Sequence, residues 1–156
     1  IMKRILVVCT GNVCRTPMVK ALLQQEVEQA GLGEQVSIDS AGVYAVVGGR
    51  ASGGSVNAMA ERDLDISDHR GKQLSFRLMD EADLILVMEE GQRRSIFMNW
   101  PNALRKTFLL TEMAGEHADV EDPYRMPQEE YDKTAVIIED LVQRGFPTML
   151  KKLGIR

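Results

Sequence analysis

Apolar and polar residues alternate along the chain in blocks that predict strands and helices in turn. Arg4–Val8 carries an unbroken apolar run, which is typical of a strand buried on both faces. Val36 and Ile38 alternate with polar neighbours and predict a second strand that closes at Ser40-Ala41-Gly42. Two further strands are predicted at Asp83–Met88, which has the nearly continuous apolar run of a parallel sheet, and at Lys106–Leu110.

Helical spacing of apolar residues appears between and after these strands. Over Pro17–Ala30, one stripe combines Val19, Leu22, Leu23, Val27 and Ala30, and Gly31 ends the helix. The glycine-rich stretch Gly48–Gly54 predicts a loop before a short helix at Ser55–Arg62, which turns Val56, Met59 and Ala60 inward. Two more helices are predicted at Glu90–Met98 and Glu129–Arg144; Gly145 and Pro147 break the latter, and Pro147 starts a last turn through Leu153.

This alternation predicts an α/β fold: a three-layer sandwich with a central four-stranded parallel sheet flanked by helices. The chain has 156 residues, of which 44% are hydrophobic, so we expect a single domain over residues 1–156. In such sheets ligands bind beyond the carboxyl ends of the strands, where the strand order changes direction. The loop after the first strand lies at such an end.

Charge and cysteine content exclude several classes of function. The net charge is −4 and no basic stripe is present, which argues against nucleic acid as a partner. No apolar run has the length of a signal-peptide core or a bilayer span, so we expect no membrane insertion. The only cysteines are Cys9 and Cys14, too few for a disulfide framework, and this usage fits the cytoplasm.

The candidate chemistry lies in Cys9-Thr10-Gly11-Asn12-Val13-Cys14-Arg15-Thr16-Pro17, which follows the first strand and opens the first helix. Gly11 and Asn12 tolerate unusual backbone angles, and Pro17 suits a first helical turn. Backbone N–H groups that turn inward in such a loop form a nest for an anion, together with the helix N-terminus. The same field favours a thiolate at Cys9, so the segment predicts phosphoryl transfer through cysteine; a buried strand-end thiol is the alternative.

Such a reaction also needs donors for the phosphate oxygens and an acid for the leaving group. The backbone N–H groups from Thr10 to Arg15 and the forked guanidinium of Arg15 can supply the donors. Thr16 can point its hydroxyl at the Cys9 sulfur. Asp122 is the best candidate for the acid, because Pro123 stiffens the turn after it and a bound dianion favours its protonated form. The nearby competitors are Glu116, Asp119 and Glu121, and an Asp-Pro pair is also typical of an ordinary turn.

These residues resemble the motifs of the low-molecular-weight protein tyrosine phosphatases, and the resemblance covers nearly the whole chain. Cys9–Pro17 resembles the family's signature and Asp122-Pro123-Tyr124 its late general-acid motif. Weaker similarities are found at Ser40-Ala41-Gly42, at Asp68-His69-Arg70 and at Ala82–Met88. The resemblance implies a phosphotyrosine phosphatase that uses neither a metal nor another cofactor. It further implies a tyrosine-phosphorylated partner protein, such as an autophosphorylating tyrosine kinase of surface-polysaccharide export.

The resemblance also implies roles for residues outside the signature. Asn12 would hold the loop in a strained shape, tethered by Ser40 and His69, although His69 alone is typical of a surface histidine in a polar loop. Tyr44 and Tyr124 would form walls around the phosphorylated ring. One segment departs from the pattern: Ser52-Gly53-Gly54 stands where relatives often carry Asp-Pro. That loop borders the site in the family. Because of this departure, the family pattern does not predict the mobility of the loop or its contacts with substrate.

Four other functions compete with this interpretation. A thioredoxin-linked arsenate reductase needs resolving cysteines downstream of Cys14, and the sequence has none. A protein-arginine phosphatase shares the signature, but Val13 offers methyl groups where those enzymes carry threonine, which favours a tyrosine ring. A phosphopeptide-binding module without activity would lack Cys9, Arg15 or Asp122. Two cysteines without clustered histidines are poor zinc ligands, although a reversible Cys9–Cys14 disulfide is plausible.

Overall fold

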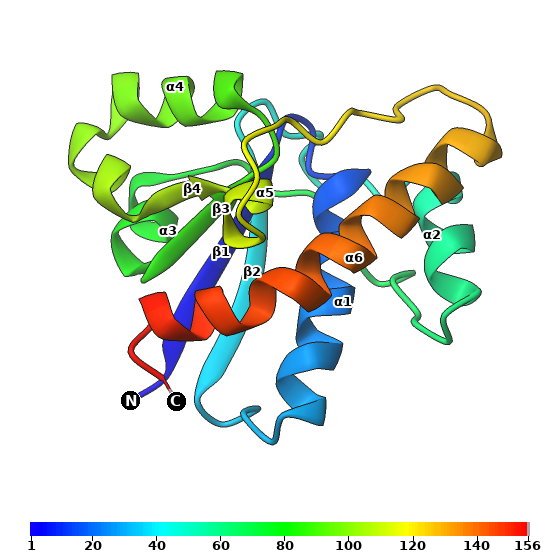
Figure 1. The fold of residues 1–156 in the computed structure, drawn as a ribbon. Coiled ribbons are helices and arrows are strands. Elements are labelled where there is room, and N and C mark those ends of the chain that lie inside the picture. Colours follow the sequence, from blue (N-terminus) through cyan, green and yellow to red (C-terminus); the bar gives the residue numbers. More distant parts are fainter. Residues whose placement is uncertain (156) are drawn as a thin grey trace.

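In a computed structural model, which describes residues 1–155, four parallel strands form one sheet in the order β2-β1-β3-β4 (Figure 1). The strands cover Lys3–Cys9 (β1), Val36–Gly42 (β2), Leu84–Val87 (β3) and Thr107–Leu109 (β4). The register sets Ile5 beside Ile38 on one side and beside Leu84 on the other. The predicted α/β fold with a four-stranded parallel sheet is therefore confirmed.

Helices cover both faces of the sheet. They span Arg15–Gln29 (α1), Gly53–Ala60 (α2), Phe76–Glu81 (α3), Glu90–Asn99 (α4), Leu110–Met113 (α5) and Gln128–Lys152 (α6), with a 3₁₀ helix at Pro101–Lys106 (η1). The side chains of β1 alternate between the two layers, as the strand period of two requires. Ile5 and Val7 pack into the core that α1 and α6 cover, whereas Leu6 and Val8 pack toward α3 and α4. Both cores exclude water from the middle strand.

The strand order changes direction at β1, because the chain passes from β1 to β2 on one side and later to β3 on the other. The carboxyl end of β1 therefore opens between two neighbouring connections, which is where parallel sheets place their ligands. Figure 1 shows the loop from β1 to α1 at this end of the sheet.

The prediction of a break in the last helix was wrong. α6 runs without interruption through Gly145 and Pro147. Pro147 removes the hydrogen bond to the carbonyl of Gln143, but both residues are exposed, so water can satisfy that carbonyl. Gly145 is a contact point: a Cβ there would lie 2.8 Å from the Cβ of Met113, so the absence of a side chain lets α6 approach α5 closely.

Smaller differences concern helix ends and short helices. The predicted loop at Gly48–Gly54 ends early, because Gly53 and Gly54 form the first turn of α2. Ala30 and Ala60 are exposed rather than inward-facing. The sequence analysis missed α3 and α5, which have six and four residues and are too short to show a period. No helix within residues 1–155 combines the length and apolar character needed to cross a membrane.

Candidate active site

The loop between β1 and α1 has its carbonyl oxygens held on its outer side. Six consecutive carbonyls accept hydrogen bonds there: Cys9 from Val43 N (3.0 Å), Thr10 from Tyr44 N (2.9 Å), Gly11 from Val46 N (3.0 Å), Asn12 from His69 Nε2 (2.6 Å), Val13 from Ser52 N (2.8 Å) and Cys14 from Ser55 Oγ (2.9 Å). In a trans peptide the C=O and the following N–H point in opposite directions, and the described residues contain no cis peptide bond. The N–H groups of Thr10 to Arg15 therefore face inward.

One of these groups shows where they point. The backbone N–H of Asn12 donates to Cys9 Sγ at 3.3 Å, and the Thr16 hydroxyl lies 3.3 Å from the same sulfur. Cys9 is buried at the centre of the loop. The sulfur thus sits among inward-facing donors, which is the arrangement of an anion nest with a nucleophile at its base.

Asn12 keeps this loop in its unusual shape. Its φ is +62°, a left-handed conformation that residues other than glycine rarely adopt, and its side chain is fully buried. The side-chain amide donates to Thr16 Oγ1 (2.8 Å) and Ser40 Oγ (3.0 Å), and its oxygen accepts from Lys72 N (2.8 Å). The structure thus brings Asn12, Ser40 and His69 together, in the arrangement that the family resemblance implies.

His69 binds the loop through Nε2, and its pKa favours the neutral form of the ring. Burial lowers the pKa of His69 below its usual 6.5, and the nearby positive charges of Lys20 and Arg70 act in the same direction. A neutral imidazole can donate from Nε2 to the carbonyl of Asn12 without placing a charge beside the loop.

Arg15 lies under the loop as a buried cation. Its Nη1 donates to the Glu89 carboxylate and to the carbonyl of Val120 (2.6 Å), and its Nη2 lies 3.5 Å from Asp122 Oδ2. Arg15 is 1% exposed, and its Nε has no partner among the described residues. A buried guanidinium N–H without a partner is costly, so this edge of Arg15 is suited to an anionic oxygen.

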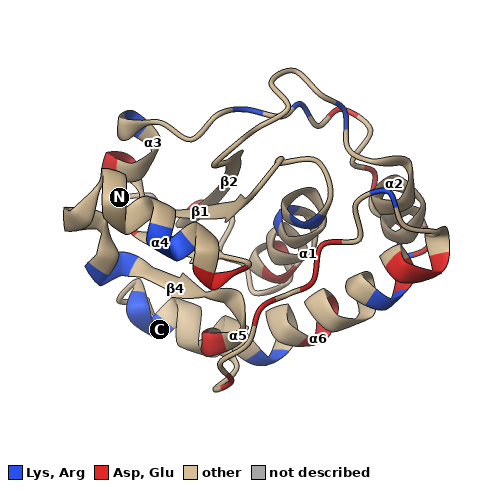
Figure 2. Cartoon of the chain, turned by 90° about the horizontal axis from the view of Figure 1, so that it is seen from above, with Lys and Arg blue, Asp and Glu red and all other residues tan. Residues whose placement is uncertain are grey.

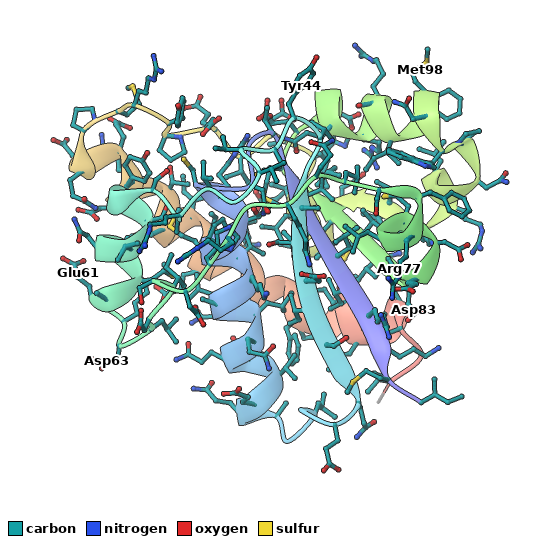
Figure 3. All side chains as sticks on the ribbon, turned by 180° about the vertical axis from the view of Figure 1, so that it is seen from behind. Tyr44, Glu61, Asp63, Arg77, Asp83 and Met98 are labelled. Carbon is teal, nitrogen blue, oxygen red and sulfur yellow. The ribbon has the colours of Figure 1, made fainter. Side chains whose placement is uncertain are left out.

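A cavity of about 190 Å³ opens above Cys9. Its lining combines Cys9, Thr10, Gly11, Val13 and Cys14 with Tyr44, Val46, Asp122 and Tyr124. Figure 3 shows Tyr44 projecting beyond the end of the sheet, and its side chain is 84% exposed. The residues predicted for the nucleophile, the acid and the ring walls therefore share one cavity.

The three competing acids lie elsewhere. Asp119 accepts a hydrogen bond from the backbone N–H of Glu90 at 2.9 Å, and Glu116 pairs with Arg144 at 2.5 Å. Glu121 is exposed and does not line the cavity. Figure 2 shows these acidic residues along the segment between α5 and α6, which passes beside the start of α1. Among the four candidates, Asp122 is the one that lines the cavity with Cys9.

Comparison with known proteins agrees with this geometry. Residues 4–154 match the family model for low molecular weight phosphotyrosine protein phosphatase. The chain belongs to this family.

Relatives of this phosphatase carry two different activities in their names. It is 39% identical over 140 residues to the low molecular weight protein-tyrosine-phosphatase Ptp of Acinetobacter johnsonii, covering 90% of this chain and 93% of the relative. It is 36% identical over 149 residues to the protein-arginine-phosphatase of Bacillus subtilis, covering 95% and 97%. The crystal structure of the low molecular weight protein tyrosine phosphatase from T. tengcongensis superposes with a TM-score of 0.88 at 38% identity, covering 94% and 99%.

Some residues of the phosphatase site were not predicted. Glu89 and Val120 hold Arg15, and Gln92 donates to Thr10 Oγ1 at 3.2 Å. Val46 lines the cavity, and Ser55 binds the carbonyl of Cys14. Glu89 follows the third strand, at the carboxyl end of the sheet. In a parallel sheet this end lies beside the end of β1, so the position of Glu89 in the sequence could have indicated a residue of the site. Nothing local in the sequence marks Val46 or Ser55.

Proposed function

We propose that this phosphatase hydrolyses phosphotyrosine in proteins through a phosphocysteine intermediate on Cys9. The observation that supports the proposal is the composition of the 190 Å³ cavity, whose lining combines Cys9 with Asp122. Tyr44, Val46 and Tyr124 supply the apolar walls that an aromatic ring requires.

In the first step, the Cys9 thiolate attacks phosphorus, and the bond from phosphorus to the phenolic oxygen breaks. Protonated Asp122 gives its proton to that oxygen, so tyrosine leaves neutral. In the second step, Asp122 takes a proton from water as the water oxygen attacks the phosphocysteine. Phosphate leaves and Cys9 returns to the thiolate, which accepts a hydrogen bond from the Thr16 hydroxyl 3.3 Å away.

The charge that develops on the phosphoryl oxygens is met by fixed donors. The inward N–H groups of Thr10 to Arg15 supply them before substrate arrives, and Arg15 Nε, which has no partner among the described residues, can donate to an oxygen that reaches it. Because these donors belong to a loop whose carbonyls are all engaged, little reorganisation is needed as the transition state forms.

The choice of phosphotyrosine over phosphoarginine rests on Val13. This residue lines the cavity and presents methyl groups where a hydroxyl would suit a guanidinium. Burying a guanidinium N–H without a partner costs on the order of 1–3 kcal/mol, which corresponds to roughly ten- to over a hundredfold in discrimination. Similarity to a protein-tyrosine-phosphatase and to a protein-arginine-phosphatase supports a mechanism common to both activities. Val13 supports phosphotyrosine as the substrate.

The proposed partner is a tyrosine-phosphorylated protein in the cytoplasm, such as an autophosphorylating tyrosine kinase of surface-polysaccharide synthesis. Family resemblance supports this choice, as does an open cavity that admits a side chain from a macromolecule. Tyr44 and Tyr124, which are 84% and 49% exposed, can contact the protein around the phosphorylated residue.

The test measures kcat/KM for matched phosphotyrosine and phosphoarginine peptides side by side. We expect the parent protein to prefer phosphotyrosine and Val13→Thr to narrow the difference by gaining activity on phosphoarginine. Higher kcat/KM for phosphoarginine in the parent protein would refute the substrate while leaving the mechanism intact.

The nucleophile and the acid have separate tests. Rapid quenching should trap phosphate on Cys9, and Cys9→Ser should abolish turnover while phosphate still binds. Asp122→Asn should slow the hydrolysis of phosphotyrosine by about 100- to 10,000-fold. It should slow the hydrolysis of activated aryl phosphates much less, because their leaving groups need no proton. Phosphate trapped on Cys14, or an equal loss on both substrates, would contradict these roles.

A further inference from the structure

The second half of the phosphate-binding loop packs against the start of α2. The backbone N–H of Ser52 donates to the carbonyl of Val13 at 2.8 Å, and the Ser55 hydroxyl donates to the carbonyl of Cys14 at 2.9 Å. Ser55 is fully buried. Of the six loop carbonyls, the one at Cys14 is the last before α1, and a side-chain hydroxyl holds it.

Hydroxyl groups also surround the Cys14 side chain. Its sulfur lies 2.9 Å from Ser52 Oγ and 3.6 Å from Tyr131 Oη. The Tyr131 ring fills the space beside Gly54, where a Cβ would come within 2.3 Å of the ring carbons. The segment Ser52-Gly53-Gly54, which departs from the family pattern, therefore makes two compatible contacts. Ser52 binds the phosphate-binding loop, and Gly54 leaves room for the Tyr131 ring of α6.

We propose that Ser55, supported by Ser52 and Tyr131, is a positioning residue that aims the backbone N–H group of Arg15 at the phosphoryl oxygens. The inference rests on the proposed function, because it concerns how the loop binds phosphate. The Cys14 carbonyl and the Arg15 N–H belong to one rigid peptide plane, so a bond that holds the carbonyl outward also holds the N–H inward.

Cys14 is the N-cap of α1, so its carbonyl also accepts the first hydrogen bond of that helix. Loss of the Ser55 hydroxyl would leave this buried carbonyl held by the helix bond alone. The peptide plane would then be free to tilt, which would turn the Arg15 N–H away from the anion. Ser52 and Tyr131 limit that rotation, because both hold the adjacent Cys14 side chain.

The experiment compares alkylation of Cys9 by iodoacetate, an anion, and by neutral iodoacetamide, with the modified peptide identified by mass spectrometry. The ratio of the two rates reports anion recognition by the loop. It is measured on protein shown to be folded by circular dichroism, because Cys9 of an unfolded chain would react without preference for the anion. Asn57→Ala is the matched control, because Asn57 lies on α2 and binds Gln128 of α6, not the loop. Vanadate affinity and kcat/KM are measured on the same proteins.

For Ser55→Ala we expect the rate ratio and the vanadate affinity to fall about tenfold, as loss of one buried hydrogen bond implies. In Ser55→Cys, which keeps a weak S–H donor, the rate ratio and the vanadate affinity should fall less. This variant keeps the test usable if the alanine variant folds poorly. Tyr131→Phe should show a smaller loss in the same direction, and Asn57→Ala none. The pH dependence of kcat/KM should be unchanged in all four.

An unchanged ratio in folded Ser55→Ala and Ser55→Cys, or a parallel fall in both alkylation rates, would overturn the proposal. Failure of the proposed function has a separate signature. It would appear in the parent protein, as the absence of a phosphocysteine on Cys9 whatever the behaviour of the Ser55 variants.

Discussion

The two halves of the phosphate-binding loop are held by different means. Backbone N–H groups of the segment after β2 hold the carbonyls of Cys9, Thr10 and Gly11. In the second half, the His69 ring and the Ser55 hydroxyl hold two of the three carbonyls, those of Asn12 and Cys14. The first half therefore depends on the path of a neighbouring backbone, and the second depends on the identity of particular side chains.

This difference decides which substitutions each half tolerates. Backbone donors survive most side-chain changes, provided that the two segments can approach each other. Side-chain donors disappear with one substitution, but they can also be tuned by charge and environment. The comparison predicts large effects from steric blocks beside the first half and smaller, graded effects from changes beside the second.

The largest effect is expected from Gly42→Ala. A Cβ at this position would lie 2.5 Å from the carbonyl oxygen of Thr10, a backbone atom with little room to move. We expect the free energy of unfolding to fall by roughly 1–3 kcal/mol, with loss of activity, as for other overpacked sites. Chemical denaturation measures the change. Gly33→Ala is the control, because nothing lies within 4 Å of its added Cβ; equal behaviour of the two variants would refute backbone contact as the cause.

A graded effect is expected from pH through His69. Because the pKa of His69 in the folded protein is lowered below 6.5, the unfolded chain takes up the proton first as the pH falls. The contribution to stability is complete above pH 6.5 and is lost as the pH falls through the lowered pKa. In His69→Gln, the free energy of unfolding should depend less on pH between about 7.5 and 5.5 than in the parent protein. Identical slopes in both proteins would show that other groups govern this range.

The smallest effect concerns Cys14 and oxidation. Mild peroxide should inactivate the phosphatase reversibly through a Cys9–Cys14 disulfide. Burial raises the pKa of Cys14, which slows its attack on an oxidised Cys9. Tyr131→Phe removes one hydroxyl contact to the sulfur and should change the recovery with thiol by only a few-fold, whereas Cys14→Ser should make inactivation harder to reverse. Unchanged recovery in Cys14→Ser would assign Cys14 to packing alone.

Sequence reasoning reached the first half of the loop more fully than the second. Strand, loop and helix follow one another at Cys9–Pro17, so local pattern and turn chemistry place the nucleophile and the nest. The roles of Ser40 and His69 were predicted only from the family resemblance. A side chain that binds a residue 28 or 57 positions away leaves no local pattern in the sequence. Ser55 and Val46 gave no signal of any kind, since serine at a helix start and an exposed valine are common.

The errors in the fold have a similar origin. Pro147 and Gly145 are helix breakers by local rule, and the prediction of a break followed that rule. The structure shows a solvent-facing proline and a glycine pressed against Met113, and both facts depend on how α6 packs against α5. Tertiary environment overrode local preference there, as it did where α2 begins at Gly53.

The anchoring of the segment that carries Asp122 has a consequence for inhibitors. Arg15 holds the carbonyl of Val120, and the Val120 N–H donates to the carbonyl of Met88 at 2.8 Å. The acid is therefore tied to the floor of the cavity and to the sheet before any substrate enters. A ligand therefore meets an acid whose segment is already anchored at Val120. Rigid compounds that match this anchored arrangement should bind more tightly than flexible analogues with the same contacts, because they lose less conformational freedom on binding.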